Sequence, residues 1–471
     1  MTLTGIGVRR RERLVMALAC AGSFVVILDA TIVSVALPGI RASLGFSTAT
    51  LPWVVNAYTL AFAGFLLLGG RCADVFGQRA MWLTGMTIFT VARVVGGLAG
   101  GPETLLAARA AQGLGAALLG PVTLSLLTAT FTDPARRARV LGAWSAVGAI
   151  GAAAGPVVGG VLTQWAGWRW VFFVTVPIGV AGLVGAARGL PRHDAPGRRP
   201  RLDLVGAVLA TTALTGVSYG VTQARGQAVL GGGLALLAIF VVHQAWWARE
   251  PLLSLGIFRL RAVSSGNAVM FLLGLGFFAS PILLSLYLQD VHGWSPLRAG
   301  LGYLPVGVAM FAGAQAAGRL TLRFGARRAT VGCCLIGAAG ALGVAAFLGV
   351  DGSYVLTVVV SGGVFGFGTA AAFTPITVAA TSGVPTAQNG LAAGLLNTVR
   401  QTSGAIGLAV LGTTSAAIAS GWATTHPHPL GPAAPAALAR GHTIAFLISA
   451  AFLISAALTA TLTMPRMPRS R

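Results

Sequence analysis

A short polar loop, Gly70-Arg71-Cys72-Ala73-Asp74-Val75-Phe76-Gly77-Gln78-Arg79, returns 248 residues later as Gly318-Arg319-Leu320-Thr321-Leu322-Arg323-Phe324-Gly325-Ala326-Arg327. Glycine, arginine, phenylalanine, glycine and arginine recur in register, and each loop follows a long apolar run. Two related halves joined in one chain produce such a repeat. Repeated halves with a binding site at their interface are the usual plan of a secondary transporter.

The composition excludes most other classes of protein. Of the 471 residues, 55% are hydrophobic and 9% are charged, whereas a soluble globular protein carries about 25% charged residues. The hydrophobicity also excludes intrinsic disorder, and the 66 glycines have no three-residue period of the collagen type. With a mean hydropathy of +0.82, the chain is predicted to be a polytopic, all-α membrane protein.

Apolar runs long enough to cross a bilayer, which takes about 20 residues, predict fourteen transmembrane helices. They lie near residues 14–38, 51–70, 80–100, 104–128, 138–162, 168–188, 203–224, 228–247, 264–289, 298–318, 328–349, 353–379, 390–418 and 441–463.

The basic residues test this number of spans. All 32 are arginines, and the net charge is +22. In a soluble protein that charge would suggest nucleic acid, but here the arginines cluster between apolar runs. With the N-terminus inside, 24 arginines fall at cytoplasmic ends and loops and four in outer loops. This bias supports an even number of spans, cytoplasmic termini and contact with anionic lipid, and it predicts no nucleic-acid partner.

The repeat and the spans together predict the domain organisation. We expect a six-helix bundle over 1–189, a cytoplasmic linker over 190–202, two inserted helices over 203–250 and a second six-helix bundle over 251–471. The inserted pair should flank the bundles, and Thr211, Thr212, Ser218 and Tyr219 would give it a minor polar surface.

Four further motifs stand on the first, fourth, fifth and thirteenth spans. They are Leu28-Asp29-Ala30-Thr31-Ile32-Val33-Ser34-Val35-Ala36-Leu37-Pro38, Arg109-Ala110-Ala111-Gln112-Gly113, Gly151-Ala152-Ala153-Ala154-Gly155-Pro156-Val157-Val158-Gly159-Gly160 and Asn397-Thr398-Val399-Arg400-Gln401. With the loop, they make the chain resemble the major facilitator superfamily, in particular its fourteen-span drug:proton antiporter branch. The resemblance covers nearly the whole chain. It implies two six-helix bundles plus two inserted central helices, with a cavity between the bundles that opens to alternate sides.

The loop and the fifth span have physical interpretations beside the resemblance. Asp74 can pair with arginine or a helix N-terminus at a domain seam, so Gly70, Asp74, Gly77 and Arg79 are the candidate conformational latch; a plain topogenic loop is the alternative. Small residues four apart let two helix backbones approach, and a mid-span proline favours a bend. The candidate antiporter helix therefore carries Gly151, Gly155, Pro156, Gly159 and Gly160, with simple helix packing as the alternative.

Ionisable residues inside a membrane are costly and usually functional. Asp29 is the one acid placed deep in a span, and Asp29 with Arg109 is the candidate proton-coupling pair, unless the two form only a structural ion pair. Arg93 is expected to snorkel to the outer interface, and Asp290 to cap an outer helix end. Arg400 either faces the cavity or packs against the fifth span or a backbone carbonyl.

The resemblance places a substrate cavity between the halves, and polar and aromatic residues of the central spans are its candidate lining. They are Asn56, Tyr58, Gln112, Trp144, Phe271, Phe365, Phe373, Asn397, Arg400 and Gln401. The charges expected at the cavity, one negative from Asp29 and two positive from Arg109 and Arg400, favour neutral or anionic amphiphiles over dications.

These features predict a proton-coupled exporter of small amphipathic compounds such as antibiotics, acting as a monomer in the bacterial cytoplasmic membrane. An exporter of a lipid, siderophore or metabolite is the first alternative, and a non-transporting sensor or scaffold the second. An enzyme is not expected, because catalytic groups at matching membrane depth are missing. Neither is a metal or cofactor, because no histidine or cysteine set has ligand spacing. Without lysine, the chain has no nucleotide-binding loop of the Gly-Lys-Ser/Thr type.

Overall fold

The computed structural model describes residues 3–47, 50–131, 133–190, 203–222, 226–248, 251–382, 384, 389–426 and 434–465. Every regular element in these residues is a helix. The elements of the first half are α1 (Leu3–Leu44), α2 (Trp53–Phe76), α3 (Gln78–Gly97), α4 (Pro102–Thr130), α5 (Pro134–Trp165), α6 (Trp170–Phe173) and α7 (Val176–Gly189). Next come α8 (Leu204–Thr222), α9 (Gln227–Val242) and the π-helical turn η1 (His243–Trp247).

The remaining helices belong to the second half. They are η2 (Leu255–Arg259), α10 (Arg261–Phe277), α11 (Ser280–Leu286), η3 (Tyr287–Val291), α12 (Pro296–Phe324), α13 (Ala326–Phe347), η4 (Val355–Gly362), α14 (Gly363–Thr381), α15 (Asn389–Thr425) and α16 (Pro435–Thr463). Helix is found at all fourteen predicted span positions. In the described part of the chain, twelve helical stretches are long and apolar enough to cross a membrane. The other two positions hold α2, of 24 residues, and α5, of 32.

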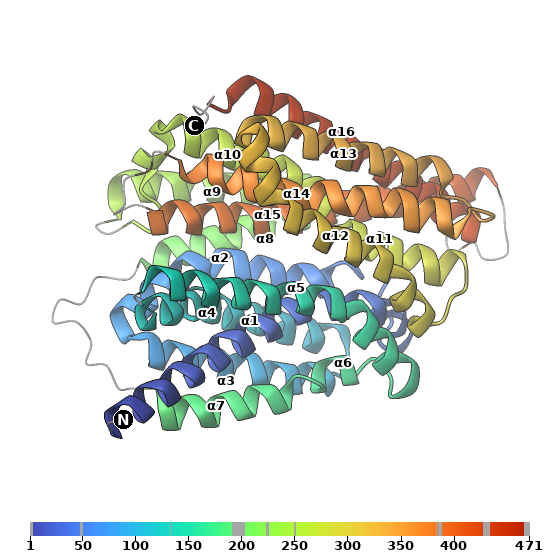
Figure 1. Cartoon of the computed structure of the whole chain (residues 1–471). Helices are drawn as coiled ribbons and strands as arrows, with labels where there is room; N and C mark the ends of the chain where they lie inside the picture. The colour runs from blue at the N-terminus through green and yellow to red at the C-terminus, as the bar shows by residue number, and fades with distance from the viewer. Residues whose placement is uncertain are drawn as a thin grey trace.

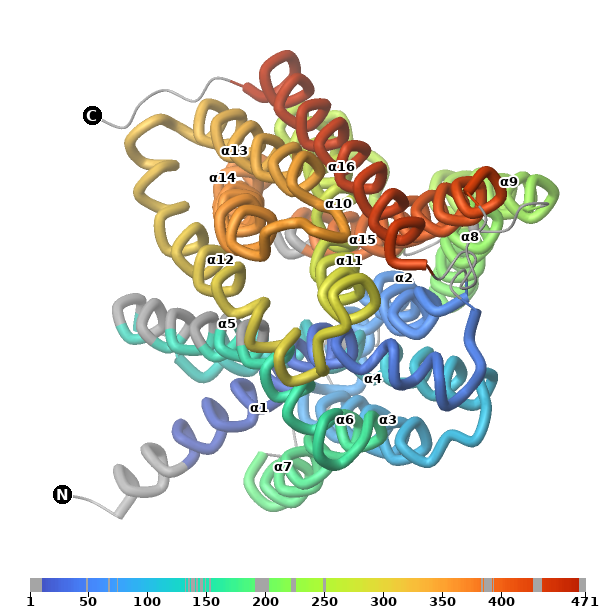
Figure 2. Tube along the Cα trace, turned by 90° about the vertical axis from the view of Figure 1, so that its right-hand side faces the viewer, coloured from blue at the N-terminus to red at the C-terminus, as the bar shows by residue number. Residues whose placement is uncertain are grey.

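The helices run side by side along one direction (Figure 1). We call the side where α1 begins and α16 ends the terminus end, and the opposite side the far end; they are left and right in Figure 1. Viewed along the helices, α1 to α7 form one group and α10 to α16 another, while α8 and α9 lie at the edge beside α2 and α15 (Figure 2).

The two repeated loops have the same geometry. Gly77 and Gly325 adopt φ angles of +84° and +78°, which L side chains rarely reach, and each joins two helices in a sharp turn. Arg79 donates from Nη2 to the carbonyl oxygen of Ala187 at 2.6 Å, near the end of α7. Arg327 donates in the same way to Thr461, near the end of α16. Each loop therefore ties the third helix of its half to the sixth.

Helix α8 joins the pair α8–α9 to the rest of the molecule. Thr211 lies against Gly64 of α2, and the rings of Tyr219 and Trp53 are 5.6 Å apart. Thr212 is exposed and Ser218 is buried. Helix α8 also packs on α15, so the pair touches both halves from the side.

Polar contacts at the terminus end hold α8 and η1 together. Asp203 accepts hydrogen bonds from the Gly206 N–H at 2.8 Å and from Gln244 at 2.6 Å, and its carboxylate lies 2.9 Å from His243 Nε2. Burial opposes ionisation of Asp203, but the hydrogen bonds from His243, Gly206 and Gln244 lower the pKa of this carboxyl below its ordinary value.

Candidate transport site

A buried ion cluster occupies the first half. Asp29 on α1 is fully buried, and Arg109 on α4 donates from Nη1 to Asp29 Oδ2 at 2.6 Å. Arg93 on α3 donates from its own Nη1 to Asp29 Oδ1. One carboxylate thus accepts from two guanidinium groups that are themselves fully buried. Such charge-assisted hydrogen bonds are stronger than neutral ones.

Backbone carbonyls complete the coordination of both arginines. Arg109 Nε donates to the carbonyl oxygen of Val54 at 2.7 Å, which ties α4 to the start of α2. Arg93 Nε donates to Phe172 at 2.8 Å, and Arg93 Nη2 donates to Val171, both on α6. The cluster therefore connects α1, α2, α3, α4 and α6, all from the first half.

The prediction that Arg93 snorkels to the outer interface is wrong. The guanidinium turns inward because a carboxylate and two helix-end carbonyls satisfy it there. The available signal was the composition of the half itself. Asp29 is the one acid placed deep in a span, while Arg93 and Arg109 lie in the third and fourth spans, and pairing both arginines with the one carboxylate lowers the cost of burying them.

Two predicted cavity residues, Gln112 and Tyr58, contact this cluster. Gln112 accepts at Oε1 from Arg109 Nη1 at 2.6 Å, and the Tyr58 ring lies 4.6 Å from the Arg109 guanidinium carbon. Tyr58 donates to the carbonyl oxygen of Val26 at 3.3 Å. Asn56 is fully buried, and neither of its amide atoms has a hydrogen-bond partner among the described residues. Gln112 and Tyr58 therefore belong to the interior of the first half.

A second group gathers in the other half, around Phe277 of α10. Its ring stacks on Phe365 at 6.3 Å and meets Phe373 edge-on at 5.4 Å, both on α14. Arg400 of α15 lies over the Phe373 ring at 5.9 Å and donates from Nη2 to Asn397 Oδ1 at 2.6 Å. The structure thus brings together Phe365, Phe373, Asn397 and Arg400.

The remaining predicted cavity residues lie apart from these two groups. Gln401 is half-buried next to Arg400 on α15. Trp144 is half-buried on α5 and packs against the first-half core. Phe271, on α10, is 36% exposed.

Helix α5 lies in the seam between the halves. Gly151, Gly155 and Gly159 face α1, and a methyl group on Gly159 would lie 2.5 Å from the carbonyl oxygen of Ile32. Gly160 faces α12 of the second half, where a methyl group would lie 2.6 Å from the Pro296 carbonyl oxygen. Gly300 of α12 in turn meets the Pro156 carbonyl. The glycines of this motif therefore let α5 approach α1 and α12 closely.

Polar contacts between the two halves lie at the far end. Arg41 Nη2 donates to Asp290 Oδ1 at 3.0 Å. Gln289 Nε2 donates to the Val35 carbonyl oxygen at 3.2 Å, and Ser285 donates to Ser34 at 3.4 Å. Among the described residues these are the hydrogen bonds that join 1–189 to 251–465, so the far end is the closed end.

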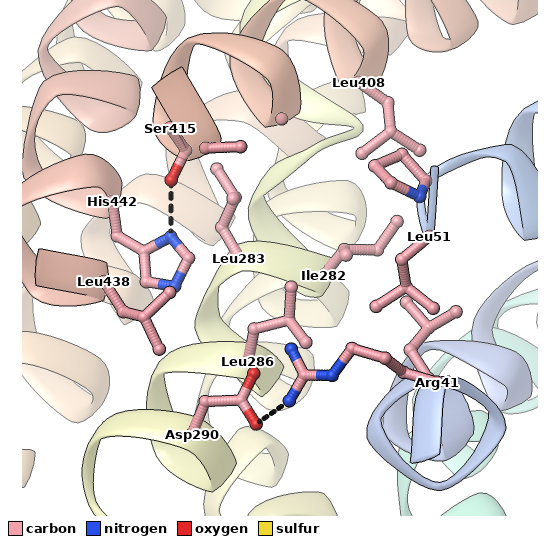
Figure 3. A pocket seen from close by; sticks show the side chains of 14 residues that line it. Arg41, Leu51, Ile282, Leu283, Leu286, Asp290, Leu408, Ser415, Leu438 and His442 are labelled. Carbon is pink, nitrogen blue, oxygen red and sulfur yellow. Dashed lines mark hydrogen bonds and ion pairs between the residues drawn. The ribbon is translucent and has the colours of Figure 1, made fainter. Parts of the chain in front are cut away.

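Figure 3 shows a pocket at this closed end, between α1, the residues just before α2, α11, η3, α15 and α16. Arg41 and Asp290 lie on one side of the pocket, and His442 lies on the other. The Nδ1 atom of His442 is hydrogen-bonded to the Ser415 hydroxyl at 3.0 Å. None of the ten predicted cavity residues lines it. The sequence analysis did not predict the Arg41–Asp290 pair, but the repeat contains a signal for it. The 248-residue offset aligns Arg41 with position 289, next to Asp290, so equivalent helix ends of the two halves carry opposite charges.

The candidate latch is described in part. Gly70 approaches Pro121 of α4, Gly77 makes the turn, and Arg79 binds the end of α7. The side chain of Asp74 lies outside the described part of the structure.

The sequence of the chain matches a known transporter family over most of its length. The sequence model of the Major Facilitator Superfamily matches residues 19–408. The chain belongs to the major facilitator superfamily. Members of this superfamily are transporters rather than enzymes, and the chain is a multi-pass integral membrane protein that carries a small-molecule substrate.

Three relatives within the superfamily are named for antibiotic export or resistance. The chain is 41% identical to the cephamycin export protein CmcT of Amycolatopsis lactamdurans, over 97% of this chain and 93% of that protein. It is 35% identical to the puromycin resistance protein pur8 of Streptomyces alboniger, over 92% and 87% of the two chains. It is 32% identical to a tetracenomycin C resistance and export protein of Streptomyces glaucescens, over 92% and 82%.

Solved structures confirm the fold. A bacterial homologue of the human lysosomal transporter Spinster, in an inward-facing and unoccupied conformation, superposes with a TM-score of 0.68 at 19% identity and covers 96% of both chains. A D-xylose–proton symporter superposes with a TM-score of 0.68 at 14% identity, over 96% of this chain and 98% of its own length. At these identities the likeness concerns the fold alone.

Proposed function

We propose that the chain exports small amphipathic antibiotics in exchange for protons, by alternating access. The full-length relatives named for antibiotic export and resistance support the substrate class. The observation that carries the proton coupling is the Asp29 cluster, in which one carboxylate is held by Arg93 and Arg109 inside the membrane-spanning bundle. Buried ionisable groups of this kind mark proton pathways.

The orientation follows from the arginine clusters. Most arginines outside the spans lie toward the terminus end, which the positive-inside rule places in the cytoplasm. The far end, where hydrogen bonds join the two halves, then faces outward. Both termini are cytoplasmic, and the membrane is the bacterial inner membrane. The domain boundaries at 189, 202 and 250 and a monomeric state belong to the same proposal.

Proton exchange at Asp29 needs a change in its partners. Each oxygen of the carboxylate accepts a hydrogen bond from one of the two guanidinium groups. Movement of α4 relative to α1 would withdraw Arg109 and leave an oxygen of Asp29 free to accept a proton. The return of Arg109 would expel that proton. Because Arg109 also holds the start of α2 through Val54, its movement is coupled to the far end of the bundle.

Inverted membrane vesicles with an imposed proton gradient test the proposal. Addition of an exported antibiotic should dissipate the gradient, reported by a pH-sensitive dye, in vesicles with the wild-type chain and not in vesicles with Asp29→Asn. Vesicles with Asp351→Asn provide the control, because Asp351 lies exposed in the connection between α13 and η4. Gradient-driven antibiotic transport by Asp29→Asn at the wild-type rate would refute proton coupling through Asp29.

A further inference from the structure

The arginines inside the bundle differ in their acidic partners: two fully buried arginines of the first half share one acid, whereas the half-buried Arg400 of the second half has none among the described residues. Arg93 and Arg109 share Asp29, but Arg400 has no such partner. From residue 251 onward the sequence contains two acids, Asp290 and Asp351. Asp290 pairs with Arg41 at the far end, and Asp351 is exposed beyond the end of α13. Neither acid neutralises Arg400.

The contacts of Arg400 leave hydrogen-bonding capacity free. Among the described residues, the guanidinium has one hydrogen bond, from Nη2 to Asn397 Oδ1, and one ring contact, with Phe373. Its Nε is buried without a partner. Neither α5 nor a backbone carbonyl satisfies it, in contrast to Arg93 and Arg109, whose Nε groups both donate to carbonyls. Guanidinium groups have five N–H donors and no acceptor, so an anion is the natural missing partner.

Asn397 and Phe373 restrict how this guanidinium can move. The amide oxygen of Asn397 holds one edge, and the Phe373 ring covers one face at 5.9 Å. Phe277 packs edge-on against Phe373, and Phe277 and Phe365 are themselves buried, so the half-buried Phe373 is the ring of this cluster next to the guanidinium. A fixed cation beside an aromatic ring matches an amphiphile with one planar anionic group and one aromatic body.

We propose that Arg400 binds the carboxylate of the exported molecule, and that the aromatic body of that molecule packs near Phe373. The free Nε–H and a neighbouring Nη–H form the donor edge that a carboxylate accepts in a bidentate manner. The preferred substrates are then monoanionic aromatic amphiphiles, and their esters and amines are poorer substrates. This inference rests on the proposed export function, because the bound molecule is a substrate only if the protein exports it. Binding to Arg400 can be measured without transport.

The first test is a matched ligand series measured on purified wild-type protein in detergent. One aromatic scaffold is used as its carboxylic acid, methyl ester and primary amine, and tryptophan fluorescence reports binding. The acid should bind roughly tenfold more tightly than the ester, as expected for a charge-assisted bidentate pair, and the amine should bind most weakly. Equal affinities for the three compounds, or tighter binding of the amine, would overturn the proposal.

Variants then assign the preference to Arg400. Arg400→Gln should weaken acid binding about tenfold and leave ester binding unchanged, whereas Arg400→Lys should lie between, because an ammonium lacks the planar fork. Arg440→Gln, which removes the same charge from an exposed position on α16, should change neither. If Arg400→Gln does not fold, Arg400→Lys and the wild-type series still decide the matter. An acid preference that survives in a folded Arg400→Gln protein would also overturn the proposal.

Transport of the same series in proteoliposomes separates this inference from the proposed function. Acid binding that depends on Arg400, without flux against a gradient, would support the site and refute export. Proton-driven flux of acid and ester with equal KM would support export and refute the site.

Discussion

The two halves of the molecule share a scaffold and differ in what they bury. Their loops have equivalent glycine turns and equivalent arginine contacts to the sixth helix. The 248-residue offset that aligns these loops places Phe277 opposite Asp29 and Ala341 opposite Arg93. The first half therefore has an ion cluster where the second has an aromatic cluster. Duplication preserved the turns and packing, whereas the central side chains diverged.

This difference suggests that the first half responds to protons and the second half binds the ligand. Among the described residues, the partners of the Asp29 cluster all belong to helices of its own half, so a change in its protonation acts first on α1, α2, α3, α4 and α6. Helix α5 packs on α1 on one side and on α12 on the other, and it can transmit that change to the second half. Arg400, near the aromatic cluster, has a free donor for a ligand.

The largest effect should come from removing the shared carboxylate. Asp29→Asn leaves two buried guanidinium groups without their counter-ion, which should cost about 3–5 kcal/mol of stability and abolish proton-driven transport. Asp29→Asn combined with Arg93→Gln should recover part of the stability but no transport. Thermal unfolding in detergent and proteoliposome flux measure the two properties. An Asp29→Asn protein as stable as the wild type would show that the cluster does not hold the first half together.

The seam between the halves should be next in sensitivity. Gly160→Val places its side chain against the Pro296 carbonyl, and overpacking of this kind costs roughly 1–3 kcal/mol. The cost falls on the conformation closed at the far end, so that end should open more often. A cysteine at Leu37, which lines the far-end pocket, should react faster with a maleimide in a background without other cysteines.

Gly231→Val is the control for this experiment, because Gly231 on α9 has open space beside it. Unchanged reactivity of the Leu37→Cys probe in the Gly160→Val protein would mean that the close α5–α12 contact does not limit closure.

A smaller effect is expected from the ion pair across the closed end. Arg41 and Asp290 are partly solvent-exposed, with side-chain exposures of 29% and 13%, and such pairs are worth about 1 kcal/mol or less. Arg41→Gln should therefore raise the reactivity of the same probe by no more than about fivefold. Arg41→Asp with Asp290→Arg should restore the wild-type rate, and Arg298→Gln, at the same end, should have no effect. If the exchanged pair does not restore the wild-type reactivity of the probe, the Arg41–Asp290 ion pair does not control opening of the far end.

The smallest effect compares the two loops directly. Arg79→Gln and Arg327→Gln each remove one hydrogen bond to a helix-end carbonyl, so each should lower the stability by about 1 kcal/mol. Only Arg79→Gln should slow transport, because Asp74 accompanies Arg79 whereas Leu322 stands in the second copy. Equal slowing by the two variants would show that the loops act alike and that Asp74 provides no separate latch.

Much of the fold was predictable from local sequence. Apolar runs gave a helix at each of the fourteen span positions, and the repeated glycines gave matching turns at Gly77 and Gly325. The spacing of Gly151, Gly155 and Gly159 predicted one face for close packing, and that face meets α1. The partner of Gly160 was not predictable, because spacing along one helix does not identify the helix opposite.

The sequence alone determined membrane insertion, the helices and the duplicated plan, because hydropathy, arginine position and turn glycines act over short stretches of chain. The tertiary structure decided which buried charges meet. Asp29 and Arg93 are 64 residues apart and Asp29 and Arg109 are 80 apart, and only packing of α1, α3 and α4 brings them within hydrogen-bonding distance. Packing also left Arg400 without an acid, because a side chain's partner depends on which helix faces it.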